Sequence, residues 1–329
     1  MVTIKDVAKK ANVSTSTVSK VLKGYENISE TTKNNVLNAV SDLGYVPNAM
    51  ASALSSKNYN RVGIWININN QRQAIDELNM QYIFGSFSKA KEINMNVKPL
   101  FSQMFVDMNK QELLTYLKSE GINALIVFGL TINNGHLIEI IEQEEINCVV
   151  VDAPKPNSHT TSISVDNALA QYEVARMIVD KYACKKILYL AGRKDGFVTF
   201  KRIEGINRLG NDVNLKIDIE YANYSELNAR EITLAIGSNY DAIICASDMM
   251  AIGAKNALKS MNIKLPVTGF DGITLLGYIN DDMYTVKQDF YHFGEVAITE
   301  IDSLLKGEKG KQVILPHSIV KIEYEDVIS

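Results

Sequence analysis

Short hydroxyl side chains and one lysine cluster within residues 14–20, where the sequence reads STSTVSK. Hydroxyls tolerate close approach to DNA base edges, and a lysine can donate to the O6 and N7 atoms of guanine. Taken singly, Thr17 would more simply cap or solvate a helix. DNA contact is therefore predicted only if a helix presents Thr15, Ser16 and Lys20 on its outer face.

Capping residues and apolar spacing predict a first helix at the start of the chain. Thr3 and Asp6 form a capping-box pair, with the acid in the first turn. The apolar residues that follow have the spacing of one buried helix face, namely Ile4, Val7, Ala8 and Ala11. A tight turn at residues 12–13 would then lead into a second helix.

A second and a third helix would complete a miniature core. Ser14 is placed to cap the second helix, whose inward residues are Val18, Val21 and Leu22. The third helix would begin at Ser29-Glu30 and end at Gly44. Its predicted buried face consists of Val36, Leu37, Val40 and Leu43. This is the helix-turn-helix pattern, and in it the hydroxyl-rich segment faces outward.

The charge distribution separates a basic head from an acidic body. Residues 1–60 hold seven lysines and four acids, whereas residues 61–329 hold 27 bases and 34 acids. A basic head suits a polyanionic partner for the head alone. The excess of three charges is modest, so charge by itself does not establish DNA binding.

Residues 45–56 read YVPNAMASALSS and predict a short, conditional helix. Pro47 would end the preceding helix, and Asn48 could cap a new one of about two turns. An isolated helix in water needs roughly 12–15 residues, so something must pack on this one. A pair from two subunits could lie in a minor groove, with Leu54 wedged into a base step. The alternative is an ordinary interdomain linker.

Almost all of residues 2–56 resemble the headpiece and hinge helix of the LacI/GalR family of repressors. The resemblance rests on VTIKDVAKKANVSTSTVSKVLKG and ISETTKNNVLNAVSDLGYVPNAMASAL, where helix spacing, turn, proline and hinge leucine recur in register. It implies base reading by Thr15, Ser16 and Lys20. It implies phosphate contacts from Thr3, Ser14, Thr17, Tyr45 and the backbone near Asn48, and minor-groove positions for Ala51 and Leu54.

The hinge departs from that family at two positions. Many members carry an arginine two residues before the leucine and a basic residue directly after it, whereas this chain has Ser52 and Ser55. Both changes remove a cation that could reach phosphate, so a weaker grip on the DNA backbone is expected. Specific affinity would then depend more on effector state and on dimerisation.

From residue 61 onward, short continuous apolar runs alternate with amphipathic stretches. The predicted strands are VGIWI from 62, VKPLF from 97, ALIVF from 124, CVVV from 148, ILYL from 187, IDIEY from 217, AIIC from 242 and VTGF from 267. Helices are predicted near 76–94, 109–119 and 134–145. This alternation predicts two parallel sheets, each covered on both faces, with a cleft at the strand carboxyl ends.

The resemblance continues more weakly over the body, at SISVDNALAQYEVARMIVD, ASDMMAIGAKNALKSMNIKLPVTGFDG, MYTVKQDFYHFGEVAITEI and ILPHSIVKIEY. It implies a domain similar to periplasmic sugar-binding proteins, with chain crossings between lobes near 160–163, 288–292 and 316–320. The expected fold is an all-α helix-turn-helix headpiece plus an α/β regulatory domain of two doubly wound parallel-sheet lobes.

The expected domains follow from these patterns. They are a headpiece at 1–46, a hinge helix and linker at 47–59, and an effector-binding and dimerisation domain at 60–329. Within the last, the N-lobe would comprise about 60–161 and 291–317, and the C-lobe about 162–290 and 318–329.

Five residues are candidates for an effector site in the cleft: Asp152, Arg202, Tyr224, Ser247 and Asp271. The resemblance implies that Asp271 binds ligand hydroxyls or amines, that Arg202 donates to the effector and that Tyr224 places its ring against it. A carboxylate at a strand end can accept two hydroxyl protons, which is what polyol recognition needs. Asp152 and Ser247 are polar residues that follow predicted strands.

Structural alternatives accompany these assignments. Arg202 could be a surface residue at a helix start, Tyr224 could pack in the core, and Asp152 could only shape a loop. Asp248 is predicted to cap the helix that follows it. Trp65, the only tryptophan, is predicted to be core, with a cleft-lining role as the alternative.

Residues 67–75 depart most from the family. They read NINNQRQAI where many members read roughly PDxxNPFF, without the aromatic pair. In the family this loop usually closes over the effector. The identity of the effector therefore cannot be carried over from the resemblance.

Sequence motifs argue against an enzyme. The chain contains no HExxH, GxSxG, GxxxxGK[ST] or GxGxxG, and its four histidines are scattered. Neither a metal nor a cofactor is predicted, and the three cysteines, Cys148, Cys184 and Cys245, are expected to be reduced core residues. No apolar run reaches the roughly 18–20 residues of a membrane helix. The N-terminus lacks a signal-peptide pattern, which predicts a cytoplasmic protein.

The predicted function is a DNA-binding transcription regulator, a repressor in the simplest case. It would bind a palindromic operator as a homodimer, with no membrane partner. A small effector would control it allosterically. Sugars or sugar derivatives are the first candidates, and purines or nucleosides are the alternative. Control by a partner protein, as in catabolite control regulators, is a further alternative.

Overall fold

The structure is a computed structural model that describes residues 2–22, 28–45, 61–67, 77–153, 156–279 and 282–328. It divides into two compact units, Met1–Tyr59 and Asn60–Ser329. The predicted hinge helix, at 47–59, lies outside the described residues. Every helix in the described segments falls short of the length and apolar character that a bilayer crossing requires.

The described part of the first unit, residues 2–22 and 28–45, contains three helices, α1 (Ile4–Lys10), α2 (Thr15–Leu22) and α3 (Glu30–Leu43). Asp6 accepts hydrogen bonds from the backbone N–H of Thr3 at 2.8 Å and from its hydroxyl at 2.7 Å. The Ser14 hydroxyl accepts from Thr17 N at 3.1 Å, and α3 ends at Gly44 with φ 59°. The predicted caps at Thr3, Ser14, Ser29 and Gly44 are therefore confirmed.

The three helices share a small core of apolar side chains. The most buried are Val7, Ala8, Ala11, Val18, Val21, Val36 and Ala39. One prediction is wrong, because Leu37 is 50% exposed while Ala39 is buried. Successive helical residues are rotated by about 100°, so the face that buries Val36 and Ala39 turns Leu37 outward.

The second unit contains two lobes. The first lobe begins with β1 (Arg61–Ile66), α5 (Glu77–Glu92), β2 (Asn96–Phe101), η1 (Ser102–Phe105), α6 (Lys110–Ser119), β3 (Ile122–Phe128), α7 (Gly135–Glu142), β4 (Asn147–Val151) and β5 (Thr160–Val165). The second lobe contains α8 (Asn167–Tyr182), β6 (Lys186–Ala191), α9 (Phe197–Val213), β7 (Lys216–Tyr221), α10 (Glu226–Ile236), η2 (Gly237–Asn239), β8 (Ala242–Cys245), α11 (Asp248–Ser260), β9 (Val267–Asp271), α12 (Leu275–Ile279) and β10 (Tyr284–Lys287). The chain ends with α13 (Phe290–Leu305), β11 (Gln312–Leu315), β12 (Ser318–Val320) and α14 (Tyr324–Ile328).

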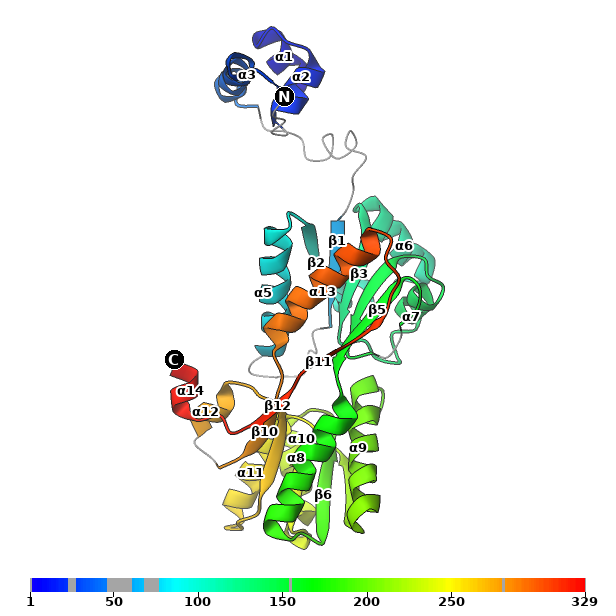
Figure 1. The fold of residues 1–329 in the computed structure, drawn as a ribbon, viewed down its shortest axis with the longest axis vertical. Helices are drawn as coiled ribbons and strands as arrows, with labels where there is room; N and C mark the ends of the chain where they lie inside the picture. Colours follow the sequence, from blue (N-terminus) through cyan, green and yellow to red (C-terminus); the bar gives the residue numbers. More distant parts are fainter. Residues whose placement is uncertain are drawn as a thin grey trace. The chain divides into compact units, whose positions relative to one another are not determined.

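Each lobe is built on a six-stranded sheet (Figure 1). The strand orders are β11-β5-β4-β3-β1-β2 and β12-β10-β9-β8-β6-β7. All pairings are parallel except that of β10 with β12. The predicted doubly wound architecture is confirmed, and each of the eight predicted strands is present.

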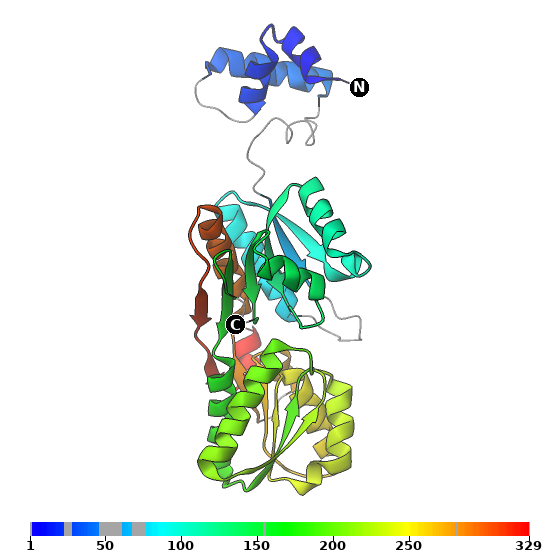
Figure 2. The same ribbon diagram turned by 90° about the vertical axis from the view of Figure 1, so that its right-hand side faces the viewer.

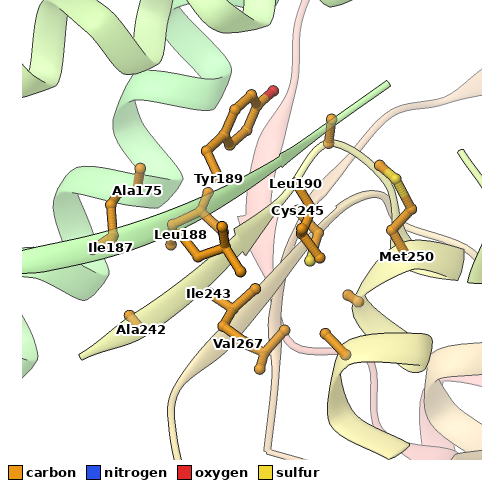
Figure 3. Packing of buried hydrophobic residues seen from close by; sticks show 14 of the residues in the cluster. Ala175, Ile187, Leu188, Tyr189, Leu190, Ala242, Ile243, Cys245, Met250 and Val267 are labelled. Carbon is orange, nitrogen blue, oxygen red and sulfur yellow. The ribbon is translucent and has the colours of Figure 1, made fainter. Parts of the chain in front are cut away.

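Side-chain alternation explains why the central strands read as continuous apolar runs. In the first lobe, Ile64 and Ile126 lie in the core formed with α5 and α13, whereas Trp65 and Leu125 pack with α6 and α7 on the other face. Because successive side chains point to opposite faces, a strand covered on both sides must be apolar throughout. The second lobe follows the same rule, and Figure 3 shows Leu188, Ile243 and Val267 from three neighbouring strands packed together.

Four strands escaped the sequence pattern. Strand β5 reads TTSISV, and because its buried Thr160, Thr161 and Ser162 are polar, it does not form a continuous apolar run. Strands β10, β11 and β12 have only three or four residues each. Short strands and polar strands carry too little periodicity to be recognised alone.

The chain passes between the lobes after β5, after β10 and after β11, as Figure 2 shows at one side of the unit. The first passage corrects the predicted lobe boundary at about 161–162. Val151 pairs with Ile163, and Leu315 pairs with Val165, so the first sheet retains its strand through Val165. The second lobe therefore begins at α8.

Helices α5 and α13 pack unusually closely on the first sheet. A Cβ atom on Gly85 would lie 1.9 Å from the carbonyl oxygen of Tyr291, and one on Gly294 would lie 2.4 Å from that of Tyr82. The Ser86 hydroxyl also donates to the carbonyl of Gly294 at 3.3 Å. The small residues thus let the two helix backbones touch.

Candidate functional site

A cavity of about 300 Å³ lies between the two lobes of the second unit. Its lining includes all five predicted residues, Asp152, Arg202, Tyr224, Ser247 and Asp271. Asp152 follows β4 of the first lobe, and the other four belong to the second lobe. The cavity therefore lies at strand carboxyl ends, where ligands collect in α/β folds.

Arg202 and Asp271 form the buried centre of the cavity. Arg202 Nη2 lies 3.6 Å from Asp271 Oδ1, Arg202 Nε donates to Asn167 Oδ1 at 2.9 Å, and Nη1 donates to the Ala246 carbonyl. The guanidinium carbon lies 3.5 Å from the ring centroid of Phe270. Arg202 is only 3% exposed and lies within α9, so its reading as a surface residue is wrong.

Burial dominates the electrostatics of the two carboxyl groups. Burial raises the pKa of Asp271 to about 7, although the Arg202 charge favours the ionised form. Burial also raises the pKa of Asp152, which accepts from Asn167 Nδ2 at 3.4 Å. A ligand that donates hydrogen bonds would favour the ionised carboxylates, because it replaces the water they have lost.

Tyr224 reaches the cavity through a strained turn. Asn223 and Tyr224 both have positive φ, 58° and 60°, a conformation that non-glycine residues rarely adopt. The Tyr224 hydroxyl lies 3.0 Å from Thr199 Oγ1. A Cβ atom on Gly192 would lie 2.1 Å from Tyr224 Cζ, so only glycine leaves room for the ring. The strain is consistent with a turn that a ligand site holds in place.

Ser247 lines the cavity as predicted and also takes the capping role that was predicted for Asp248. Ser247 is the N-cap of α11, since its hydroxyl accepts from Met250 N at 3.4 Å. Asp248 does not cap the helix. Its buried carboxylate accepts from Gly272 N at 2.7 Å, from Ile273 N at 2.9 Å and from the Thr285 hydroxyl at 2.6 Å. Asp248 therefore shapes the turn that follows Asp271.

Gln288 is a cavity residue that sequence reasoning missed. Its Nε2 donates to Asp271 Oδ1 at 3.2 Å, and it is 4% exposed. Its Oε1 has no hydrogen-bond partner among the described residues. Gln288 directly follows β10, whose Lys287 pairs with Asp271, so recognising β10 as a strand would have found it. Other missed lining residues include Glu77, Thr131, Phe197, Met249 and Phe290.

Trp65 belongs to the core rather than to the cavity. It is 5% exposed and stacks on Phe105 with ring centroids 4.9 Å apart. Of the atypical loop 67–75, only Asn67 lies among the described residues, and it lines the cavity. The part of the chain that the structure describes contains no cluster of His, Cys, Asp or Glu able to hold a metal ion.

The predicted DNA-contacting residues of the first unit lie largely at its surface. Thr3, Ser14, Thr15, Ser16 and Lys20 are exposed, and Thr17 and Tyr45 are half-buried. The hydroxyl of Ser14 lies 2.7 Å from that of Ser16 and 2.9 Å from that of Thr17. Asn48, Ala51 and Leu54 lie outside the described residues. The outer face of α2 thus combines hydroxyls with one lysine, a set suited to a major groove.

Comparisons with known proteins agree with this architecture. Residues 3–48 match the lacI family of bacterial regulatory proteins, and residues 111–309 match the periplasmic binding protein domain. The chain is 26% identical to the HTH-type transcriptional regulator RegA of Clostridium saccharobutylicum, covering 97% of this chain and 98% of that protein. It is 27% identical to catabolite control protein A of Staphylococcus aureus, covering 98% of both.

The fold is also that of a solved structure of the lac repressor dimer bound to operator and the anti-inducer ONPF. The TM-score is 0.83 at 22% identity, and the match covers 98% of each chain. The helix-turn-helix unit and the two-lobed domain therefore occur together in the relatives over nearly their whole length. This chain therefore joins a helix-turn-helix domain of the lacI family of bacterial regulatory proteins to a periplasmic binding protein domain, the arrangement of a DNA-binding regulator with an effector domain.

Proposed function

We propose that this regulator binds a palindromic operator as a homodimer and that a small polyhydroxylated effector, a sugar or sugar derivative, controls it from the interlobe cavity. The observation that carries the proposal is the convergence of Asp152, Arg202, Tyr224, Ser247 and Asp271 on one cavity of about 300 Å³. That volume lies at the lower end of the range for small-molecule sites.

The chemistry of the cavity supports a ligand rich in hydrogen-bond donors. Asp152 and Asp271 offer carboxylate oxygens, and Gln288 offers an amide oxygen without a partner among the described residues. Arg193, the other described arginine in the lining, is bound to Asp195 at 2.7 Å. Vicinal hydroxyls would satisfy these acceptors, and Tyr224 supplies an apolar face for a sugar ring.

A homodimer is proposed because one headpiece reads only one half-site of a palindrome. Helix α5 offers a surface for it. Met80, Phe84 and Phe87 recur at helical spacing on its outer side and are 46%, 56% and 39% exposed. Contiguous exposed apolar patches mark association surfaces. Sedimentation of Phe84→Glu should show a shift from dimer to monomer.

Control would be exerted through two states of the lobes. An effector that binds one lobe arrangement better shifts the population toward it, and the DNA-binding heads would respond through the connecting segment. Whether the effector releases DNA or promotes binding depends on which arrangement it favours. A purine or nucleoside effector and control by a partner protein are the alternatives that the experiments below separate.

DNA binding is tested with an operator selected from random duplex DNA by the full chain. Affinity for that operator, measured at several salt concentrations, should fall steeply as salt increases because phosphate contacts release counterions. Deleting residues 1–57 should abolish specific binding. Retention of specific affinity by the truncated chain would overturn the proposal.

The effector is tested by thermal shift with a panel of sugars, sugar phosphates, nucleosides and purines. A ligand that raises the midpoint of the full chain should lose its effect in Asp271→Ala. The matched control is Asp212→Ala, which removes an acid from the solvent-facing part of α9. A midpoint shift only with purines or nucleosides would favour a purine or nucleoside effector. A shift with none of the small molecules, but with a protein added from the same cell, would favour control by a partner protein.

A further inference from the structure

Glu77 joins the first lobe to the turn that follows the cavity carboxylate Asp271. Glu77 is the first residue of α5, and Thr274 lies in the second lobe just before α12. Both carboxylate oxygens of Glu77 lie 3.1 Å from Thr274 N, and Oε2 accepts from the Thr274 hydroxyl at 2.9 Å. Glu77 also lines the cavity, so this interlobe contact lies at its rim.

Three consecutive backbone N–H groups after Asp271, those of residues 272–274, each donate to a carboxylate. Asp248 accepts from Gly272 N at 2.7 Å and from Ile273 N at 2.9 Å, both contacts lying inside the second lobe. The next N–H, that of Thr274, is held by Glu77 from the first lobe. The first lobe thus supplies one of the bonds that fix a turn whose first residue, Asp271, has φ 117°.

On the first-lobe side of the contact, α5 is held in place by α13. Helix α5 is locked to α13 by the close approach at Gly85 and Gly294. Helix α13 begins two residues after Gln288, whose amide donates to Asp271 at 3.2 Å. Glu77 therefore links the α5–α13 pair directly to the Asp271 turn, while Gln288 contacts Asp271 from the crossing segment between β10 and α13.

We propose that Glu77 is the closure latch of the cavity and a positioning residue for Asp271. Hydrogen bonds are lost beyond a donor–acceptor distance of about 3.5 Å, so hinge opening that moves α5 away from Thr274 breaks the latch. Closing the lobes and fixing the Asp271 turn are then one event. This inference rests on the proposed function for its purpose, but the latch itself is a property of the two lobes.

The test measures the distance between the lobes in the full chain by pulsed electron spin resonance. Spin labels are placed at two exposed positions, Glu139→Cys in α7 and Lys259→Cys in α11, while Cys148, Cys184 and Cys245 are buried and escape labelling. Glu77→Ala removes every bond of the contact and should raise the open-to-closed ratio about fivefold or more, whereas Thr274→Val removes only the hydroxyl bond and should raise it by a smaller factor. The double variant should match Glu77→Ala alone, because Thr274→Val removes only the hydroxyl bond and leaves the backbone N–H that also donates to Glu77.

Two further variants serve as controls, one conservative and one distant from the contact. Thr274→Ser retains the hydroxyl and should restore the distribution of the unmodified chain. Glu92→Gln is the matched control, because it removes a carboxylate from the far end of α5, where Glu92 pairs with Lys89 at 2.7 Å, and it should change nothing. Unchanged distributions in both Glu77→Ala and Thr274→Val, or fully additive effects in the double variant, would overturn the latch.

The outcome is separable from that of the proposed function. A wider distance distribution in Glu77→Ala with no sugar response in the thermal-shift panel would support the latch and reject the effector class. A sugar that binds the unmodified chain and Glu77→Ala equally, with the same distance distribution in both, would reject the latch and keep the effector class.

Discussion

Arg202 Nη2 lies 3.6 Å from Asp271 Oδ1, and the two side chains are only 4% and 12% exposed. Arg202 is also the group that opposes the rise in the pKa of Asp271. A buried pair of this kind adds little net stability when intact, since desolvation offsets the attraction. Removing Arg202 alone leaves the buried Asp271 carboxyl and the Ala246 carbonyl without this partner, and the first prediction tests that loss.

Arg202→Met should destabilise the second unit by about 3–5 kcal/mol, because it strands Asp271 and the Ala246 carbonyl in the interior. Arg208→Met is the matched control on the same helix. Its side chain is 62% exposed and lies 3.7 Å from Asp212, so it should change stability by less than about 0.5 kcal/mol. Urea unfolding followed by Trp65 fluorescence measures both. Equal losses in the two variants would contradict the prediction.

Asp271 should make stability fall as pH rises. Its pKa in the folded chain, about 7, lies above the ordinary value of 3.8. The folded state therefore holds the proton more tightly than the unfolded state. That contribution is complete below about pH 4 and is lost as the pH rises toward 7.

The measurement compares the unmodified chain with Asp271→Asn between pH 5 and pH 8.5. From pH 5 to 7 the variant should gain stability relative to the unmodified chain by up to about 1.4 kcal/mol per pH unit, and then level off. The difference between the two proteins contains the titration of Asp271 together with its coupling to Asp248, because the Asp271 charge helps to raise the pKa of Asp248. Parallel stability curves would show that Asp271 ionises normally.

Gly85→Ala should destabilise the second unit by about 1–3 kcal/mol, the cost of overpacking a close contact. The new Cβ would lie 1.9 Å from the Tyr291 carbonyl oxygen and would force α5 and α13 apart. Gly135→Ala is the control, since nothing lies within 4 Å of a Cβ at that position in α7. That change should be neutral or stabilise slightly, because alanine favours helix. Urea unfolding distinguishes the two outcomes.

Lys20→Ala should weaken operator binding by about 1–3 kcal/mol if Lys20 donates to a guanine edge. Lys33→Ala is the comparison in the same unit, because Lys33 lies on α3 and pairs with Glu30 at 2.7 Å. The two variants should differ in fluorescence-anisotropy titrations with the selected operator and with a scrambled duplex. Lys20→Ala should lower the ratio of the two affinities, whereas Lys33→Ala should leave that ratio unchanged. Equal ratios would remove Lys20 from base reading.

Local sequence determined the helices and most of the strands of this protein. Thr3 with Asp6, Ser14, Ser29 and Gly44 mark helix ends through their own side chains or backbone freedom, so the headpiece could be predicted in detail. The long apolar strands predicted both sheets, because a strand that is buried on both faces carries few polar residues. The wrong assignment of Leu37 shows that the pattern does not fix which helix face is buried, because neighbouring residues lie about 100° apart around the helix and Val36 is buried while Leu37 is exposed.

The tertiary structure alone decided the site and its couplings. The polar strand β5 and the short strands β10–β12 are stabilised by their neighbours rather than by their own periodicity, so the position of the first lobe crossing and the role of Gln288 came only with the sheets. The sequence singled out Arg202 and Asp271 through a family resemblance. The raised pKa of Asp271, the Asp248 bonds to its turn and the Glu77 latch depend on residues 23 to 194 positions away, brought together by packing. Contacts between residues so far apart in the sequence produce no pattern within any one segment, because each residue bonds to a partner in another element.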